Sequence, residues 1–156
     1  MSVRSSQRSI PKAKFQVAEA AKDLLDYSVC IINSKKVCRP RTPDRLKNRM
    51  QQITLSEYYD IKNYAERAYI NIISANSVYK KNTIDMARRA KYIENAINSL
   101  IAVKALLNEC ANAYHIDLKK IQRWNSLATV AKDKAEAWQK SDRLDSRKRL
   151  DCHSID

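Results

Sequence analysis

Apolar side chains recur every three or four residues through four long stretches of the chain, the spacing of one buried face on an α-helix. This pattern predicts helices over about residues 10–33, 43–79, 83–114 and 118–139. Four long helices with short connections predict an all-α chain folded as an antiparallel up-down four-helix bundle. The core positions that the spacing predicts are Val17, Ala18, Ala21, Leu24, Leu25, Ser28, Ile31, Ile32, Ile61, Tyr64, Ala65, Ala68, Ile72, Ala75, Tyr79, Met86, Ala90, Ile93, Ile97, Leu100, Ile101, Val103, Leu107, Cys110, Ile121, Trp124, Ala128, Ala131, Ala135 and Trp138.

Proline and polar residues mark the expected helix ends. Proline is well tolerated in the first helical turn, so Pro11 and Pro43 indicate the first two starts. Thr83 with Asp85 is expected to open the third helix, and Asp117 to cap the fourth. The short connections that result are what a bundle requires.

The length of 156 residues fits a single domain with a core of its own. Residues 1–9 are polar and predict a flexible basic arm, and residues 10–140 form the predicted bundle. After Gln139 the apolar spacing stops, so residues 141–156 are expected to be a polar, charged tail that frays.

The second and third helices carry more apolar surface than one bundle core needs. Tyr69, Ile70 and Ile73 fall off the main stripe, and residues 98–107 are apolar nearly all round. Self-association would bury this surplus, so we expect a homo-oligomer. The alternative is a thicker core covered by the arm and the tail.

Composition narrows the function classes. The chain has no glycine, which counts against an all-β fold and excludes glycine-rich nucleotide loops. Its four cysteines and two histidines show no metal-ligand spacing and no nucleophile signature. We therefore expect no enzyme activity, no cofactor, no metal and no small-molecule substrate.

The sequence also predicts no targeting signal. The opening residues, Met1–Ser9, have no apolar core like that of a secretory signal. No apolar run approaches the roughly 20 residues that span a bilayer. We expect a cytoplasmic protein with reduced thiols and no membrane partner.

Charge is the main indication of a partner. Lysine and arginine total 30 against 17 acidic residues, a net charge of +13. Such a charge repels itself in a compact chain, and an anionic partner, most commonly nucleic acid, relieves that repulsion. Binding through it should weaken steeply with salt. The alternative is a protein whose lysines are only solvated.

The basic residues gather around the predicted connections. The first and third connections share one end of an antiparallel bundle, so their clusters should lie close together, with the second connection toward the opposite end. The residues expected to bind nucleic acid are Lys35, Lys36, Arg39, Arg41, Arg45, Lys47, Arg49, Lys80, Lys81, Arg88, Arg89, Lys91, Lys119, Lys120 and Arg123.

Several short motifs resemble the accessory variability determinant family, the small helical bundles encoded beside the reverse transcriptases of diversity-generating retroelements. The motifs span most of residues 1–143. They are Ser2-Val3, Ser6-Gln7-Arg8, Lys14-Phe15-Gln16-Val17, Ser74-Ala75-Asn76-Ser77-Val78, Ile121-Gln122-Arg123-Trp124 and Trp138-Gln139-Lys140-Ser141-Asp142-Arg143.

This resemblance implies a pentameric barrel of four-helix bundles with a basic surface. It implies binding to the retroelement reverse transcriptase and its structured RNA, in support of mutagenic cDNA synthesis by the polymerase. It fixes no binding residue individually. Two other hypotheses for the function remain. One is an RNA-associated bundle of the kind encoded in ribosomal RNA intervening sequences, and the other is a basic structural protein of a phage or plasmid.

Overall fold

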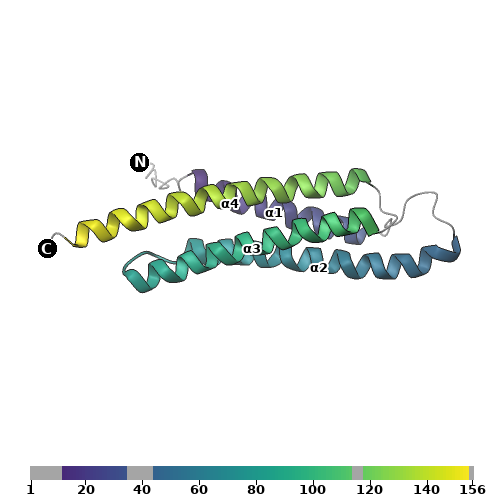
Figure 1. The fold of residues 1–156 in the computed structure, drawn as a ribbon, viewed down its shortest axis with the longest axis horizontal. Coiled ribbons are helices and arrows are strands. Elements are labelled where there is room, and N and C mark those ends of the chain that lie inside the picture. Colours follow the sequence, from purple (N-terminus) through teal and green to yellow (C-terminus); the bar gives the residue numbers. More distant parts are fainter. Residues whose placement is uncertain (1–11, 35–43, 114–117, 155–156) are drawn as a thin grey trace, which may run out of the picture.

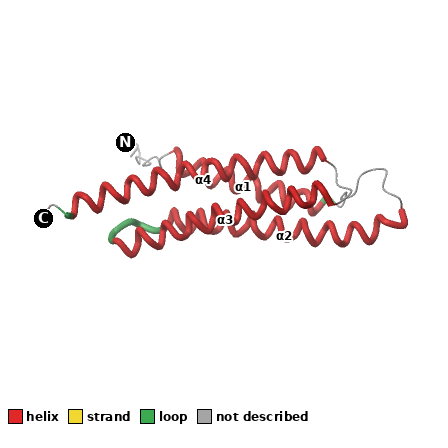
Figure 2. Tube along the Cα trace, in the orientation of Figure 1, coloured by secondary structure: helices red, strands yellow, loops and turns green. Residues whose placement is uncertain are grey.

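The computed structural model describes residues 12–34, 44–113 and 118–154. These residues form four helices and no strand. The helices are α1 (Lys12–Asn33), α2 (Asp44–Ser77), α3 (Thr83–Ala113) and α4 (Leu118–His153). Successive helices run in opposite directions along one long axis (Figures 1 and 2). The predicted all-α, four-helix architecture is confirmed.

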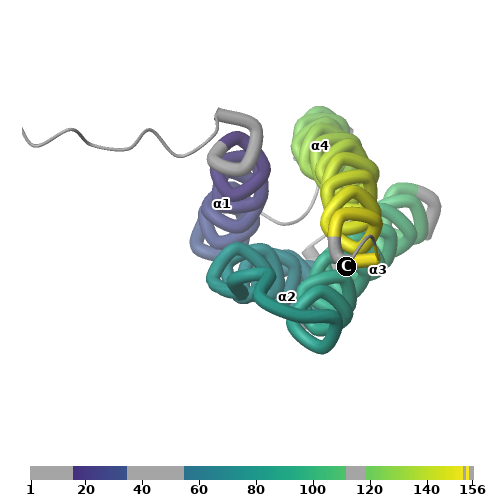
Figure 3. Tube along the Cα trace, turned by 90° about the vertical axis from the view of Figure 1, so that its left-hand side faces the viewer, coloured from purple at the N-terminus to yellow at the C-terminus, as the bar shows by residue number. Residues whose placement is uncertain are grey.

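The helices follow one another around the bundle in chain order. α1 packs against α2 and α4, and α3 packs against the same two helices. The end-on view in Figure 3 shows the four helices surrounding a common centre. Buried alanines such as Ala65, Ala96 and Ala131 let the helix backbones approach closely along this centre.

The indole of Trp124 is the largest fully buried side chain and joins three helices. Its Nε1 donates a hydrogen bond to Ser28 Oγ at 2.8 Å, and that hydroxyl donates to the carbonyl oxygen of Leu24 at 2.7 Å. The rings of Tyr27 and Tyr58 meet the indole edge-on. The single polar atom of the indole is thereby satisfied inside an apolar core.

The predicted core stripes of α1 and α4 are confirmed, because all their members are buried or half-buried. Three predictions elsewhere are wrong. Tyr79 is 73% exposed because α2 ends at Ser77 and leaves that ring in the turn. Ala90 and Ile101 are also exposed, on the side of α3 away from the core.

α3 begins at Thr83 with Asp85 in its first turn, as predicted, and Asn82 caps it. Asn82 Oδ1 accepts a hydrogen bond from the backbone N–H of Asp85 at 2.8 Å. This is the geometry of an asparagine N-cap, with Thr83 as the first helical residue. The predicted start at Pro11 and the predicted cap at Asp117 lie outside the described residues.

The expected frayed tail is wrong for the residues that the structure describes. α4 continues without a break to His153, past the beginning of α1 and past the α2–α3 turn (Figure 1). Apolar spacing stops after Trp138, and polar residues continue the same inward stripe. The helix is therefore held here by ion pairs that a count of apolar positions does not detect. We call residues 140–153 the α4 extension.

Candidate nucleic-acid interface

The predicted cluster around the first connection is mostly outside the described residues. The residues outside the described ranges are Lys35, Lys36, Arg39 and Arg41. The first turns of α2 contain the other three, Arg45, Lys47 and Arg49. α2 begins at the end of the bundle where α1 finishes and α4 starts (Figure 1). The expectation that the first and third connections share one end is therefore confirmed for the helix ends.

The third predicted cluster lies at that same end, on the first turns of α4. Lys119 and Arg123 are exposed and Lys120 is half-buried. The guanidinium of Arg123 stacks over the Tyr27 ring at 5.3 Å. Tyr27 also donates a hydrogen bond from its hydroxyl to the carbonyl oxygen of Lys120 at 3.4 Å. These contacts fix the first turns of α4 against α1.

The second cluster, at the opposite end, divides into exposed and buried residues. Lys81, Arg88 and Lys91 are exposed. Lys80 and Arg89, in contrast, are 8% and 3% exposed. Their predicted place in an anion-binding surface is therefore corrected, because a buried charge that is already paired is not presented to a polyanion.

The Lys80 ammonium forms a buried ion-pair network with the α4 extension. Its Nζ lies 2.8 Å from Asp142 Oδ1 and 2.9 Å from Asp145 Oδ2. It also donates to the carbonyl oxygen of Asp142 at 3.1 Å. Donation from Lys80 lowers the pKa of Asp145, and the nearby Arg149 lowers it further. All three ammonium donors thus have acceptors, as a buried lysine requires.

The Arg89 guanidinium links α3, α2 and α4. Its Nε donates to Asp142 Oδ1 at 2.8 Å. Its Nη1 donates to the carbonyl oxygens of Ala75 and Val78, at 3.0 and 3.3 Å, where α2 ends. A cation here is favoured because the last carbonyls of a helix carry partial negative charge. The same group lies over the Trp138 ring at 5.4 Å.

The α4 extension adds basic residues that the sequence analysis missed. Its carboxylates Asp142 and Asp145 point into the network, and Arg149 joins them through Asp145 Oδ2 at 3.2 Å. Four of the side chains left exposed outside the network are basic. These are Lys140, Arg143, Arg147 and Lys148.

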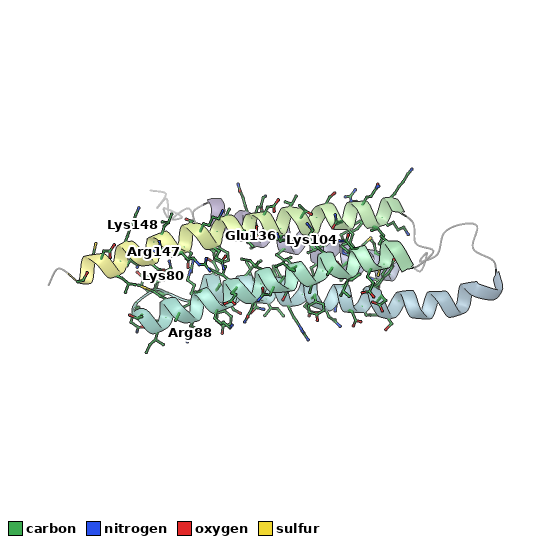
Figure 4. All side chains as sticks on the ribbon, viewed as in Figure 1. Lys80, Arg88, Lys104, Glu136, Arg147 and Lys148 are labelled. Carbon is green, nitrogen blue, oxygen red and sulfur yellow. The ribbon has the colours of Figure 1, made fainter. Side chains whose placement is uncertain are left out.

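We call this end of the bundle, residues 79–91 with residues 139–153, the basic end. It contains ten lysines and arginines and four aspartates. Figure 4 shows Arg88, Arg147 and Lys148 around it, with Lys80 between α4 and the α2–α3 turn. The signal in the sequence is the spacing of Asp142, Asp145 and Arg149 by three and four residues, which continues the helix beyond its apolar stripe.

Other chemistry finds no support in the described part of the chain. No group of three potential metal ligands occurs there. Burial raises the pKa of the Cys110 thiol to about 12, with Glu57 and Glu109 adding to the shift, so this thiol stays protonated. None of the described helices is long and apolar enough to cross a membrane.

Comparisons with known proteins returned no relative. No protein-family model matches the chain, no curated protein matches it, and neither does any solved structure. Exposed basic side chains lie at both ends of the bundle, and at one end Asp142 is buried against Lys80 and Arg89.

Proposed function

We propose that this chain is a non-catalytic accessory protein that binds a retroelement reverse transcriptase and its structured template RNA, and supports mutagenic cDNA synthesis. It acts as a homo-oligomer, a pentamer by the resemblance of its motifs. The observation that carries the proposal is the composition of the basic end. Two of its four aspartates, Asp142 and Asp145, pair with Lys80. Several lysines and arginines outside this network are exposed and can meet phosphates, although Arg88 and Lys91 also pair with carboxylates of their own helix.

The distribution of charge supports binding to RNA. Residues 55–77 of α2 carry two basic and three acidic side chains, so positive charge is concentrated away from the middle of this helix. Localised positive charge lets a protein neutralise several phosphates of one strand and release their counterions. The rigid helices hold these charges at fixed separations, which suits a folded RNA.

Exposed apolar side chains support binding to protein partners. Val29 of α1 and Tyr59, Ile70 and Ile73 of α2 are all at least 38% exposed. These two helices pack against each other, so a partner that covers one is close to the other. Burial of such side chains favours association, either with further copies of this chain or with the polymerase.

The first experiment is co-purification of the protein from its native gene cluster, with the bound protein identified by mass spectrometry and the bound RNA sequenced. The proposal expects a reverse transcriptase together with one structured RNA. Recovery of neither would overturn it. Recovery of ribosomal RNA fragments without a polymerase would assign the chain to the intervening-sequence class instead.

A charge-reversal pair tests whether the basic end binds the RNA. Arg147→Glu with Lys148→Glu should weaken RNA binding and reduce the slope of log K against log salt. The matched control is Lys22→Glu with Lys134→Glu, which changes the net charge equally at exposed positions outside the basic end. Equal losses in both pairs would mean that the net charge of the protein alone governs binding.

A further inference from the structure

A shallow groove whose lining includes four asparagine side chains runs along the outer side of the α2–α3 pair. Two pockets of about 290 and 340 Å³ adjoin there, and both are lined by Tyr64 and Arg67. Their shared residues make them parts of one groove. Its remaining polar lining consists of Asp60, Asn63, Asn71, Asn95, Asn98 and Ser99.

The side-chain amides of this groove have unused hydrogen-bonding capacity. Asn71 Nδ2 donates to the carbonyl oxygen of Arg67 at 2.8 Å, which leaves its Oδ1 as an acceptor. Asn63, Asn95 and Asn98 form no side-chain hydrogen bond within the described part of the chain. Each amide offers two donors and a carbonyl acceptor. The groove therefore presents donors and acceptors side by side, as the edges of nucleobases do.

A stacked cation and ring lie where the two pockets meet. The Arg67 guanidinium lies over the Tyr64 ring, 5.3 Å from its centre. Unpaired bases commonly stack on tyrosine rings and on arginine guanidinium planes, with hydrogen bonds to their edges from neighbouring side chains. Arg67 can also meet the phosphate of a bound nucleotide.

We propose that this groove binds unpaired nucleobases of an RNA strand. The inference rests on the proposed RNA-binding function and adds that the groove contacts the unpaired bases of that RNA. Arg88 of the basic end lies on the same face of α3 as Asn95 of the groove, because the two residues are seven apart, about two helical turns. A strand whose phosphates meet Arg88 would direct its next bases toward the amides.

The lining argues against a small-molecule site. Pockets for small ligands are mostly apolar and bury most of the ligand, whereas this groove is open and, among the described residues, Leu106 is the one aliphatic residue that lines it. The asparagine amides of the groove could also form hydrogen bonds with the backbone of an extended peptide. A nucleobase is favoured over a peptide, because the Arg67–Tyr64 stack and the nearby basic end both suit a nucleotide.

The test measures the affinity of a single-stranded RNA of about 12 nucleotides, a length within the span of known single-strand sites. The groove variant is Asn95→Ala with Asn98→Ala. The control is Asn76→Ala with Asn108→Ala, exposed asparagines of the same two helices outside the groove. We expect a loss of at least about fivefold for the groove variant, as for the loss of a base contact, and no loss for the control.

A hairpin RNA in which the same bases are paired separates this inference from the function it rests on. Paired bases cannot enter the groove, so both variants should bind the hairpin as the wild-type protein does. A wild-type protein that binds neither RNA would overturn the proposed function itself. Binding of both RNAs with no difference between groove and control variants would overturn the groove alone.

Cross-linking locates the bases directly. A single strand that contains 4-thiouridine should cross-link to the tryptic peptides that carry Tyr64 or Asn95. Cross-links confined to other peptides would contradict the proposal. A groove variant that keeps its RNA affinity and loses the polymerase in a pull-down would show that the groove binds protein, and the proposal would then be wrong.

Discussion

Asp142 Oδ1 accepts from Arg89 Nε at 2.8 Å, so one buried carboxylate on α4 neutralises a buried guanidinium on α3. The same oxygen lies 2.8 Å from the Lys80 ammonium. Because one carboxylate serves two buried cations, this contact helps to hold the α4 extension on the α2–α3 turn, together with the ion pair between Lys80 and Asp145.

Replacement of that carboxylate should therefore destabilise the fold. Asp142→Ala leaves Lys80 and Arg89 buried with one shared partner fewer, and loss of one member of a buried pair typically costs about 3–5 kcal/mol. Urea denaturation followed by circular dichroism measures the free energy of unfolding. Asp151→Ala, an exposed aspartate of the same extension, is the control and should change it by less than about 0.5 kcal/mol. Similar small losses in both variants would contradict the role given to Asp142.

The contribution of Asp145 should depend on pH. Its pKa in the folded state lies below the ordinary value of 3.8, chiefly because Lys80 donates to it. A lowered folded pKa means that the stabilisation is present above pH 3.8 and is lost as the pH falls through the lower folded value. Wild type should thus be more stable than Asp145→Asn at pH 6, and the gap should narrow below about pH 4. Denaturation curves at both pH values test this, and a gap that is constant with pH would contradict it.

The core hydrogen bond between Trp124 and Ser28 gives a third prediction. Ser28→Ala removes the acceptor of the indole N–H and leaves a buried donor unsatisfied, which costs about 1–3 kcal/mol. The exposed Ser126 on α4 provides the control, Ser126→Ala, for which no such loss is expected. Denaturation followed by tryptophan fluorescence measures both. Equal stabilities would mean that the indole finds another acceptor.

Much of the fold could be predicted from the sequence because the relevant residues repeat at helical spacing. The stripe from Ile121 to Trp138 was identified correctly from that spacing alone. The same rule ended the fourth helix too early, since Asp142, Asp145 and Arg149 continue the stripe with charges instead of apolar groups. Apolar spacing predicts burial by the hydrophobic effect, and it does not detect helix positions that are held by ion pairs.

The candidate site was less predictable because charge along a sequence does not show which charges are paired. Lys80 and Lys81 are adjacent, yet the first is buried in a network and the second is exposed. The difference comes from carboxylates about sixty residues away on α4, a tertiary contact that no local pattern encodes. Asn95 likewise lines the groove only because α3 packs against α2, which its position in the sequence does not show.

Among the three cysteines that the structure describes, thiol reactivity should separate the buried one from the two exposed ones. Cys110 is fully buried with a pKa of about 12, whereas Cys30 and Cys152 are exposed. Only the thiolate reacts with alkylating reagents, so iodoacetamide at pH 8 should modify Cys30 and Cys152 well before Cys110. Peptide mapping by mass spectrometry over time follows each site. Modification of all three at one rate would show that the bundle opens readily under these conditions.

Assembly should depend on the exposed apolar residues of α2. Ile70 is 53% exposed in a stretch of near-zero net charge, so a carboxylate placed there would have to be desolvated in any contact that covers it. Ile70→Asp should lower the mass measured by light scattering after size exclusion while the helical content stays unchanged. Ile84→Asp, at a position that is 78% exposed beside the α2–α3 turn, is the matched control and should keep the wild-type mass. If Ile70→Asp also keeps that mass, Ile70 of α2 does not form a contact between copies.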